Sequence, residues 1–307
     1  MRRLTKTKKD AMSLTIANDI INGAQQGPAG LKTALYDMLT KNKTAVLGAA
    51  IILLFTLAAI FAPFLSPYDP AAINLPNRLA PPSLAHLFGT DDIGRDLFTR
   101  VMYGGRISLM IGVAPSLISL IFGAAMGLVA GYFGGKVDFF IMRLADVMLA
   151  FPSLLLAMVV MYIIGPTLLN LFIALSIISW GGTARVVRAQ TLSLKEKEFV
   201  EAARSMGVKR SAIMIRHILP NCLPSLIVLF TLDIPAAILS EASLSFLGIG
   251  AQPPTASWGL MVNAGKKYAY NCPWLILAPG LAILLIVMAF NFLGDGLRDA
   301  IDPYLKS

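Results

Sequence analysis

The chain has 307 residues, of which 56% are hydrophobic and only 14% are charged, and its mean hydropathy is +0.71. A soluble domain carries roughly 25% charged residues because water must wet its surface. This composition therefore excludes a soluble globular protein and indicates an integral membrane protein. The net charge of +9 is explained by basic cytoplasmic loops, so we expect no nucleic acid among its partners.

The first 43 residues are polar and basic, and they contain no apolar core followed by a small-residue cleavage site. We therefore expect a permanent membrane anchor after a cytoplasmic tail at 1–43, rather than a cleaved signal. Within this tail, apolar residues recur at helical spacing beside lysines over 31–43. This pattern predicts an amphipathic helix on the inner leaflet.

Six apolar runs are candidates for transmembrane helices, because a helix needs about 20 apolar residues to cross roughly 30 Å of hydrocarbon. The six expected spans are 44–65, 107–131, 138–164, 166–184, 219–247 and 274–293. The third run contains Arg143 and Asp146, which lie three residues apart and can neutralise each other on one helix face. Gly165 and Pro166 form the expected turn into the fourth span.

Basic residues are concentrated in two segments that an even number of spans places on the same side. They are Arg2, Arg3, Lys6, Lys8, Lys9, Lys32, Lys41 and Lys43 before the first span, and Arg185, Arg188, Lys195, Lys197, Arg204, Lys209, Arg210 and Arg216 before the fifth. Because cytoplasmic loops are enriched in Lys and Arg, both termini are predicted to be cytoplasmic. The 66–106 segment, proline-rich at its start, is then extracytoplasmic. It precedes a five-helix core at 107–298 and a cytoplasmic tail at 299–307.

The sequence contains no signature of a catalytic or metal site. Neither HExxH nor GxSxG occurs, and His86 and His217 are the only histidines. The AGYFGGKV stretch at 130–137 resembles a phosphate-binding loop, but Ala130 and Val137 stand where that loop requires glycine and Ser or Thr. We therefore expect no catalytic residue, no metal and no bound ATP in this chain.

Two features inside the spans invite a functional interpretation. Gly123, Gly127 and Gly131 lie four apart, which predicts close helix packing, either within the chain or against a partner subunit. Asp233 and Glu241 lie eight apart on roughly the same face of the fifth span. A charge at the bilayer centre costs about 2.5–3.5 kcal/mol on insertion scales, so such residues face protein or water. Both acids are candidates for a translocation path; the alternatives are pairing with a partner helix or a protonated acid.

A short charged segment interrupts the apolar runs between the fourth and fifth spans. Its sequence is FVEAARSMGVKRSAIMIRHILPN, at 199–221. Good helix formers lead to Gly207, which can end a first helix in a left-handed conformation. Ser211 can cap a second helix, which Pro220 is expected to close. Small residues beside an acid suit a helix that docks in another protein's groove, whereas a loop that merely carried charge would require neither the alanines nor the glycine.

This segment resembles the EAA motif, EAA-x3-G-x9-I-x-LP, of the permease subunits of ABC importers. The matching positions are Glu201, Ala202, Ala203, Gly207, Leu219 and Pro220. His217 replaces the isoleucine of the motif, and RHILPN at this place resembles the peptide and nickel branch. The segments 88–109, 240–261 and 291–303 resemble further signatures of that branch. From about residue 43 onward, the chain is similar to the second, C-type permease subunit.

The resemblance implies a type I ABC importer permease fold in a bacterial or archaeal plasma membrane. It implies three kinds of partner besides lipid: a second, different permease, two ATPase subunits that bind the ATP and Mg, and an extracytoplasmic substrate-binding protein. The 185–218 segment would carry the coupling helix, at 199–207, seated in an ATPase cleft. The implied coupling interface comprises Phe199, Glu201, Ala202, Ala203, Arg204, Gly207, His217, Leu219 and Pro220.

The implied function is that of a non-catalytic permease subunit, forming half of the path of an ATP-driven importer for dipeptides or oligopeptides. The first alternative is a nickel complex or another small solute carried by an importer of the same branch. A more distant alternative is a proton-coupled carrier that uses Asp233 or Glu241, and a structural scaffold is a third. Neither of the last two gives the EAA segment a role.

Overall fold

The computed structural model describes residues 38, 40 and 42–301. Within this part the regular secondary structure is helical, apart from an isolated bridge between Thr90 and Asp96. The predicted all-α fold is therefore confirmed for the described residues. The expected amphipathic helix before the first span lies almost wholly outside them, as does most of the 299–307 tail.

Five helical stretches are long and apolar enough to cross a membrane. They are α3 (Lys43–Ile60), α5 (Leu97–Phe133), α8 (Leu168–Leu194), the stretch Arg210–Phe246, which ends in α11 (Leu219–Phe246), and α13 (Trp274–Ile301). Shorter elements accompany them: α4 (Ala62–Leu65), η1 (Leu75–Asn77), α12 (Trp258–Gly265) and η3 (Lys266–Tyr268). Several of the long helices extend beyond the expected spans. α5 begins ten residues early because the Asp96 carboxylate caps it, accepting a hydrogen bond from the Thr99 amide at 2.8 Å.

The expected third span at 138–164 is not one straight helix. It consists of α6 (Gly135–Ala150) and α7 (Ser153–Ile164), which meet at 94°. Pro152 causes the break, because its ring disfavours the helical conformation in the preceding residue. Phe151 is accordingly extended, with φ −96° and ψ 143°. The chain has six spans if this bent pair counts as one.

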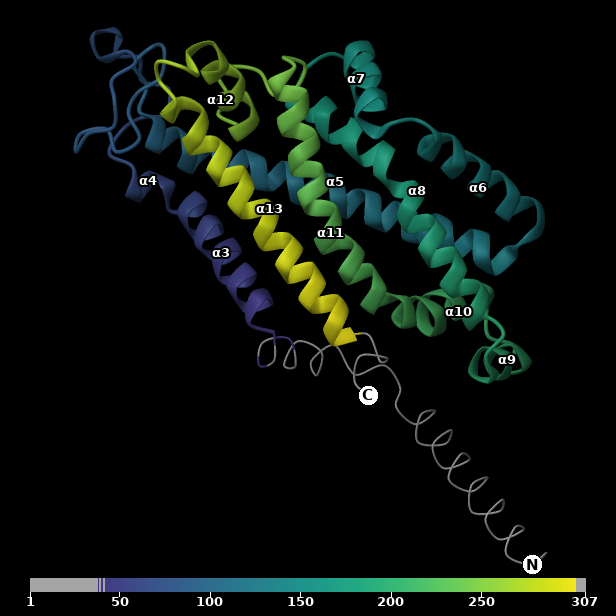
Figure 1. Ribbon diagram of the computed structural model, residues 1–307. Coiled ribbons are helices and arrows are strands. Elements are labelled where there is room, and N and C mark those ends of the chain that lie inside the picture. Colours follow the sequence, from purple (N-terminus) through teal and green to yellow (C-terminus); the bar gives the residue numbers. More distant parts are fainter. Residues whose placement is uncertain (1–37, 39, 41, 302–307) are drawn as a thin grey trace, which may run out of the picture.

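The helices form an elongated bundle with two distinct ends (Figure 1). The first residues of α3, the last residues of α13 and the short helix α9 (Glu198–Ser205) lie at one end. α7, α12 and the irregular 66–96 segment lie at the other end. The described chain thus begins and finishes on the same side, as an even number of crossings requires.

The glycine face of α5 packs against α8 of the same chain. A Cβ built on any of the three glycines would collide with α8. Its nearest neighbour would be Trp180 O at 2.6 Å for Gly123, Ala184 O at 2.5 Å for Gly127, and Thr191 Cβ at 2.7 Å for Gly131. The absence of side chains therefore allows the two backbones to approach closely. This packing lies within the chain, which was one of the two possibilities that the sequence left open.

Candidate functional site

The short helix α9 has one buried face and one open face. Val200 and Ala203 are 0% and 2% exposed, so they anchor the helix to the bundle. Phe199, Glu201 and Ala202 are exposed on the other side. Figure 1 shows α9 at the tip of the bundle, beyond the ends of the spans. The open face combines an aromatic ring, a small residue and a carboxylate in a position that a partner protein can reach.

A tight corner follows α9, as the sequence predicted. Gly207 has φ +76°, in the left-handed region that glycine adopts without strain. The Gly207 amide donates to Arg204 O at 3.0 Å and the Val208 amide donates to Ala203 O at 3.1 Å. These two bonds form the Schellman motif that ends many helices. The corner is therefore fixed by these backbone hydrogen bonds, and the side chain of Val208 packs against the cluster that contains Val200 and Ala203.

The chain beyond the corner differs from the prediction. α10 (Arg210–Ile213) is followed by a π-helical turn, η2 (Met214–Ile218), which runs directly into α11. Pro220 lies in the first turn of α11, so it does not close the helical stretch. The wider turn accommodates this proline, since the Leu219 amide bonds to Met214 O, five residues back. Asn221 Nδ2 donates to the backbone carbonyl of His217 at 2.7 Å.

The anchoring face of α9 belongs to a cluster that joins four helical elements. Val200 and Ala203 pack with residues of α5, α8 and the 210–246 stretch. The other buried members are Ala124, Leu128, Val187, Ile213, Ile218, Cys222 and Leu226. His217 and Leu219 are half-buried beside it. This close-packed cluster joins α9 to these spans.

Polar contacts fasten the neighbouring helix ends. Arg188 of α8 makes a bidentate ion pair with Asp138 of α6, in which Nη2 donates to Oδ2 at 2.5 Å. Lys195 Nζ donates to the carbonyl of Gly131 at the end of α5, at 3.1 Å. Such bidentate pairs are geometrically specific. The end of the bundle nearest α9 is thus tied together as a unit.

The two intramembrane acids have different surroundings. Glu241 is 1% exposed, and its Oε1 accepts hydrogen bonds from Ser245 Oγ at 2.7 Å and from Ser257 Oγ at 2.8 Å. Asp233 is half-buried, and within the described residues it has no hydrogen-bond or ion-pair partner. The two lie about 12 Å apart along the helix, given 1.5 Å rise per residue. The structure does not bring them together.

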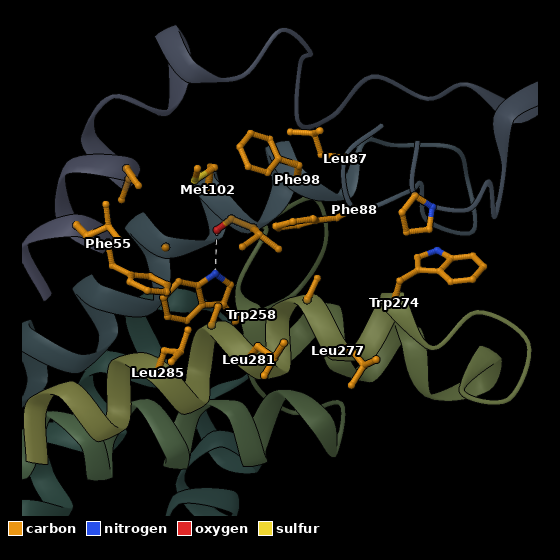
Figure 2. Close-up of a pocket in the computed structure, with 18 of the residues that line it drawn as sticks. Phe55, Leu87, Phe88, Phe98, Met102, Trp258, Trp274, Leu277, Leu281 and Leu285 are labelled. Carbon is orange, nitrogen blue, oxygen red and sulfur yellow. Dashed lines mark hydrogen bonds between the residues drawn. The ribbon is translucent and has the colours of Figure 1, made fainter. Parts of the chain in front are cut away.

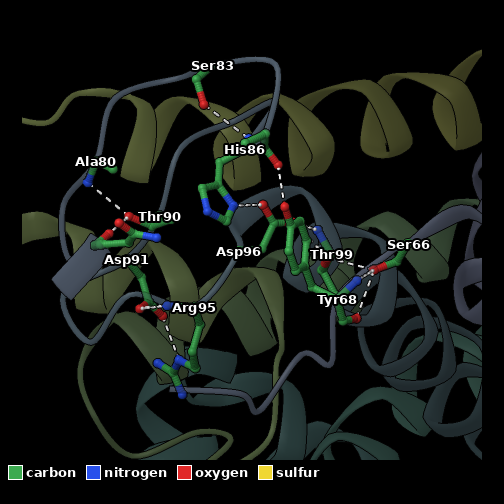
Figure 3. A network of polar contacts seen from close by, with 12 residues as sticks. Ser66, Tyr68, Ala80, Ser83, His86, Thr90, Asp91, Arg95, Asp96 and Thr99 are labelled. Atoms are coloured by element: carbon green, nitrogen blue, oxygen red, sulfur yellow. Dashed lines mark hydrogen bonds and ion pairs between the residues drawn. The ribbon is translucent and has the colours of Figure 1, made fainter. Parts of the chain in front are cut away.

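At the opposite end, the 66–96 segment is held by a polar network that the sequence did not reveal (Figure 3). His86 Nδ1 lies 2.8 Å from Asp96 Oδ1, and Ser66 Oγ lies 2.6 Å from Thr99 Oγ1. Tyr68 donates its hydroxyl to a backbone carbonyl across the segment, at 2.9 Å. Although it has little regular secondary structure, the segment is a defined cap on the first two long helices.

A second part of this network surrounds Asp91. Its carboxylate accepts from the amides of Ile93 and Arg95 and from Arg95 Nε at 2.6 Å, and it lies 3.6 Å from Arg100 Nε. Asp91 and Arg100 are both buried. In the part of the chain that the structure describes, no group of three His, Cys, Asp or Glu side chains is placed to hold a metal ion.

Comparison with known proteins agrees with these features. Residues 123–307 match the family model described as binding-protein-dependent transport system inner membrane component, and residues 36–82 match the N-terminal TM domain of oligopeptide transport permease C. The dipeptide transport system permease protein DppC of Alkalihalophilus pseudofirmus is 48% identical over 89% of this chain and 90% of its own length. The oligopeptide transport system permease protein OppC of Bacillus subtilis is 44% identical over 86% and 87%, respectively.

A solved structure shows the same fold. The MetNI methionine ABC transporter, in an inward-facing conformation, contains a chain that matches with a TM-score of 0.51 at 18% identity. The match covers 66% of this chain and 97% of that one. The helical arrangement is therefore that of an ABC importer permease.

Proposed function

Because this chain belongs to the family of binding-protein-dependent transport system inner membrane components, we propose that it forms half of the translocation path of an ATP-driven importer for peptides. It is a multi-pass permease subunit of the bacterial plasma membrane. Its partners are a second permease, ATPase subunits and an extracytoplasmic binding protein. Peptides are the proposed cargo because the DppC and OppC relatives are named for dipeptide and oligopeptide transport.

The observation that carries the proposal is the two-sided construction of α9. Its open face presents Phe199, Glu201 and Ala202, while Val200 and Ala203 fix its inner face to the bundle. An anchored helix with a small, accessible surface fits a groove on a partner. We assign α9 as the coupling helix. The Glu201 carboxylate pairs with a basic group of the ATPase, since charge-assisted hydrogen bonds are stronger than neutral ones.

In the proposed mechanism, movement of the ATPases is passed to the spans through packed side chains. A push on α9 is carried by Val200 and Ala203 into the cluster shared with α5, α8 and α11. The fixed corner at Gly207 keeps α9 at a constant angle to the helix that follows. The helices therefore tilt together, because a close-packed core does not absorb the displacement.

ATP and Mg are assigned to the partner ATPases, and this chain is assigned no catalytic residue. It contributes half of the translocation path and, in α9, the helix that passes movement of the ATPases to the spans. The half-buried, unpartnered Asp233 is the candidate lining residue of that path. Glu241 is held inside the chain by two serines, so a lining role for it requires a rearrangement at the end of α11.

Uptake into proteoliposomes tests this function. The complete importer, with its binding protein outside and ATP inside, is expected to accumulate a labelled dipeptide or oligopeptide, and a proton gradient without the ATPases is expected to give none. Uptake driven by the gradient alone would contradict the proposal. A melting-temperature screen of the binding protein separates the cargo classes: a rise with peptides supports peptide import, and a rise only with nickel complexes favours the alternative.

A further inference from the structure

Helices α3 and α13 pack closely through small residues near the start of α3. Near the start of α3, a Cβ on Gly48 would lie 2.5 Å from the carbonyl oxygen of Ala289. Ala45 is completely buried against the last turns of α13. Small residues thus bring the two backbones together there. Farther along, bulky residues such as Leu54 and Leu285 take their place and line a pocket.

This pocket is an apolar groove of about 720 Å³ between α3, α5 and α13 (Figure 2). Trp258 forms its floor, where the indole Nε1 donates to Val101 O at 2.8 Å and Phe55 packs edge-on at 5.8 Å. Leu87 and Phe88 of the outer segment line one end of the groove. Nearly every lining side chain is aliphatic or aromatic, so the groove suits a hydrocarbon ligand and does not suit water.

The groove opens on the outer surface of the spans. Leu54 of α3 and Leu281 of α13 line it, yet they are 64% and 52% exposed on the outer surface of the spans. In a membrane protein, such an apolar surface is covered by acyl chains. The mouth is therefore continuous with the hydrocarbon that surrounds α3 and α13, and a chain can enter from the side.

The length of the groove matches one leaflet of the membrane. Its lining on α13 runs from Trp274 to Leu285, which is about 16 Å of helix at 1.5 Å per residue. Half of the hydrocarbon core is about 15 Å. Trp274 lies at the end of the bundle away from α9, beside the 66–96 segment. The groove thus spans the outer leaflet from its surface toward the bilayer centre.

Trp274 marks this outer end of the groove. Its indole packs under the outer segment, where a Cβ built on Gly89 would lie 2.9 Å from Trp274 Nε1. Tryptophan is enriched at the membrane interface, where its ring is in hydrocarbon beside the polar headgroups. The position of Trp274 therefore places this end of the groove at the level of the lipid headgroups.

We propose that this groove binds one acyl chain of an outer-leaflet phospholipid, whose headgroup lies at the level of Trp274. The acyl chain packs between α3 and α13 and contacts the indole of Trp258. It attaches the first span to the rest of the bundle where protein packing alone does not. The proposal depends on the membrane location of the chain and not on which solute the importer carries.

Photolabelling of the intact importer tests the proposal. The complex is reconstituted with a phospholipid that carries a diazirine on its acyl chain, irradiated, and mapped by peptide mass spectrometry. Trp258 is the informative residue, because it is 1% exposed and can be reached only through the groove. We expect adducts on Trp258 and Phe55. Adducts confined to outward residues such as Leu53 and Leu284 would overturn the proposal, as would cross-links that place a helix of the second permease in the groove.

Two variants of α13 provide the control. Ala278→Phe places a ring in the groove and is expected to abolish the Trp258 adduct. Gly280→Phe adds the same ring to the same helix where a Cβ meets no atom within 4 Å, and it is expected to leave the adduct unchanged. Equal labelling of Trp258 in wild type and Ala278→Phe would contradict the proposal. If Ala278→Phe does not fold, the positions of the wild-type adducts still show whether the acyl chain enters the groove.

Discussion

The Val208 amide donates a hydrogen bond to the carbonyl of Ala203 at 3.1 Å, and this bond closes the corner between α9 and the helix that enters the membrane. Ala203 is buried in the cluster shared with three spans, whereas Ala202 beside it is exposed. The surface that a partner can touch and the surface that holds the spans are thus two faces of the same turn of helix. The corner fixes the angle between them.

Gly207→Val is expected to uncouple ATP hydrolysis from transport without preventing membrane insertion. No atom lies within 4 Å of a Cβ at this position, so the φ of +76° is the sole source of strain. A β-branched residue in this conformation costs about 1–3 kcal/mol, which changes the angle of the corner. Gly207→Asn is the control, because asparagine tolerates the left-handed region. ATPase activity and uptake are measured together, and normal uptake by Gly207→Val would count against the corner.

Glu201→Lys is expected to weaken recovery of the ATPases with the permease in pull-downs. Loss of a charge-assisted hydrogen bond costs about 1.5–3 kcal/mol, which corresponds to roughly a tenfold to hundredfold weaker affinity. Glu196→Lys makes the same charge reversal just before α9, at another exposed position, and is expected to have little effect. Equal recovery of the ATPases with both variants would remove Glu201 from the interface.

Gly127→Ala is expected to lower the melting temperature of the complex. Its Cβ would lie 2.5 Å from the backbone carbonyl of Ala184, so α5 and α8 must separate. Overpacking of this kind costs about 1–3 kcal/mol. Gly182→Ala, on α8, meets no atom within 4 Å and is expected to raise stability slightly, by up to about 1 kcal/mol. Thermal unfolding in detergent compares the two, and equal effects would argue against the tight α5–α8 contact.

Glu241→Leu is expected to destabilise the chain, whereas Glu241→Gln is expected to be tolerated. The leucine variant leaves the buried hydroxyls of Ser245 and Ser257 without their acceptor. Each buried group left unpaired lowers the free energy of unfolding by about 1–3 kcal/mol. The glutamine retains an acceptor oxygen. Thermal unfolding and uptake are measured for both variants. A Glu241→Gln variant of normal stability that has lost uptake would contradict the structural role and restore Glu241 to the translocation path.

Much of the architecture follows from local patterns. Apolar length predicts the positions of the spans, and the four-residue spacing of Gly123, Gly127 and Gly131 predicts a packing face. The helix end at Gly207 can be predicted from the sequence because glycine is the residue that most often takes the left-handed conformation after a helix. These features depend on neighbours only a few residues away, so one sequence is sufficient to place them.

Other features depend on long-range contacts or on competing signals. Pro152 marks the bend between α6 and α7, but the apolar run continues across it and suggests one straight span. Asp96 signals the early start of α5 in the same local way, yet it lies in a segment that prolines make appear irregular. The partner of Glu241, Ser257, is 16 residues away across a loop. The groove beside Trp258 arises from packing of α3, α5 and α13, which no local pattern encodes.

The central claim is that the ATPases bind the open face of α9, and site-directed cross-linking tests it most directly. The native cysteines, Cys222 and Cys272, are both buried, so an introduced thiol reacts selectively. Ala202→Cys lies on the open face of α9, and Ser83→Cys lies exposed at the opposite end of the bundle. In the intact complex, a thiol-to-amine cross-linker is expected to join the ATPase to Ala202→Cys and not to Ser83→Cys. No product with Ala202→Cys, or equal products with both, would contradict the account.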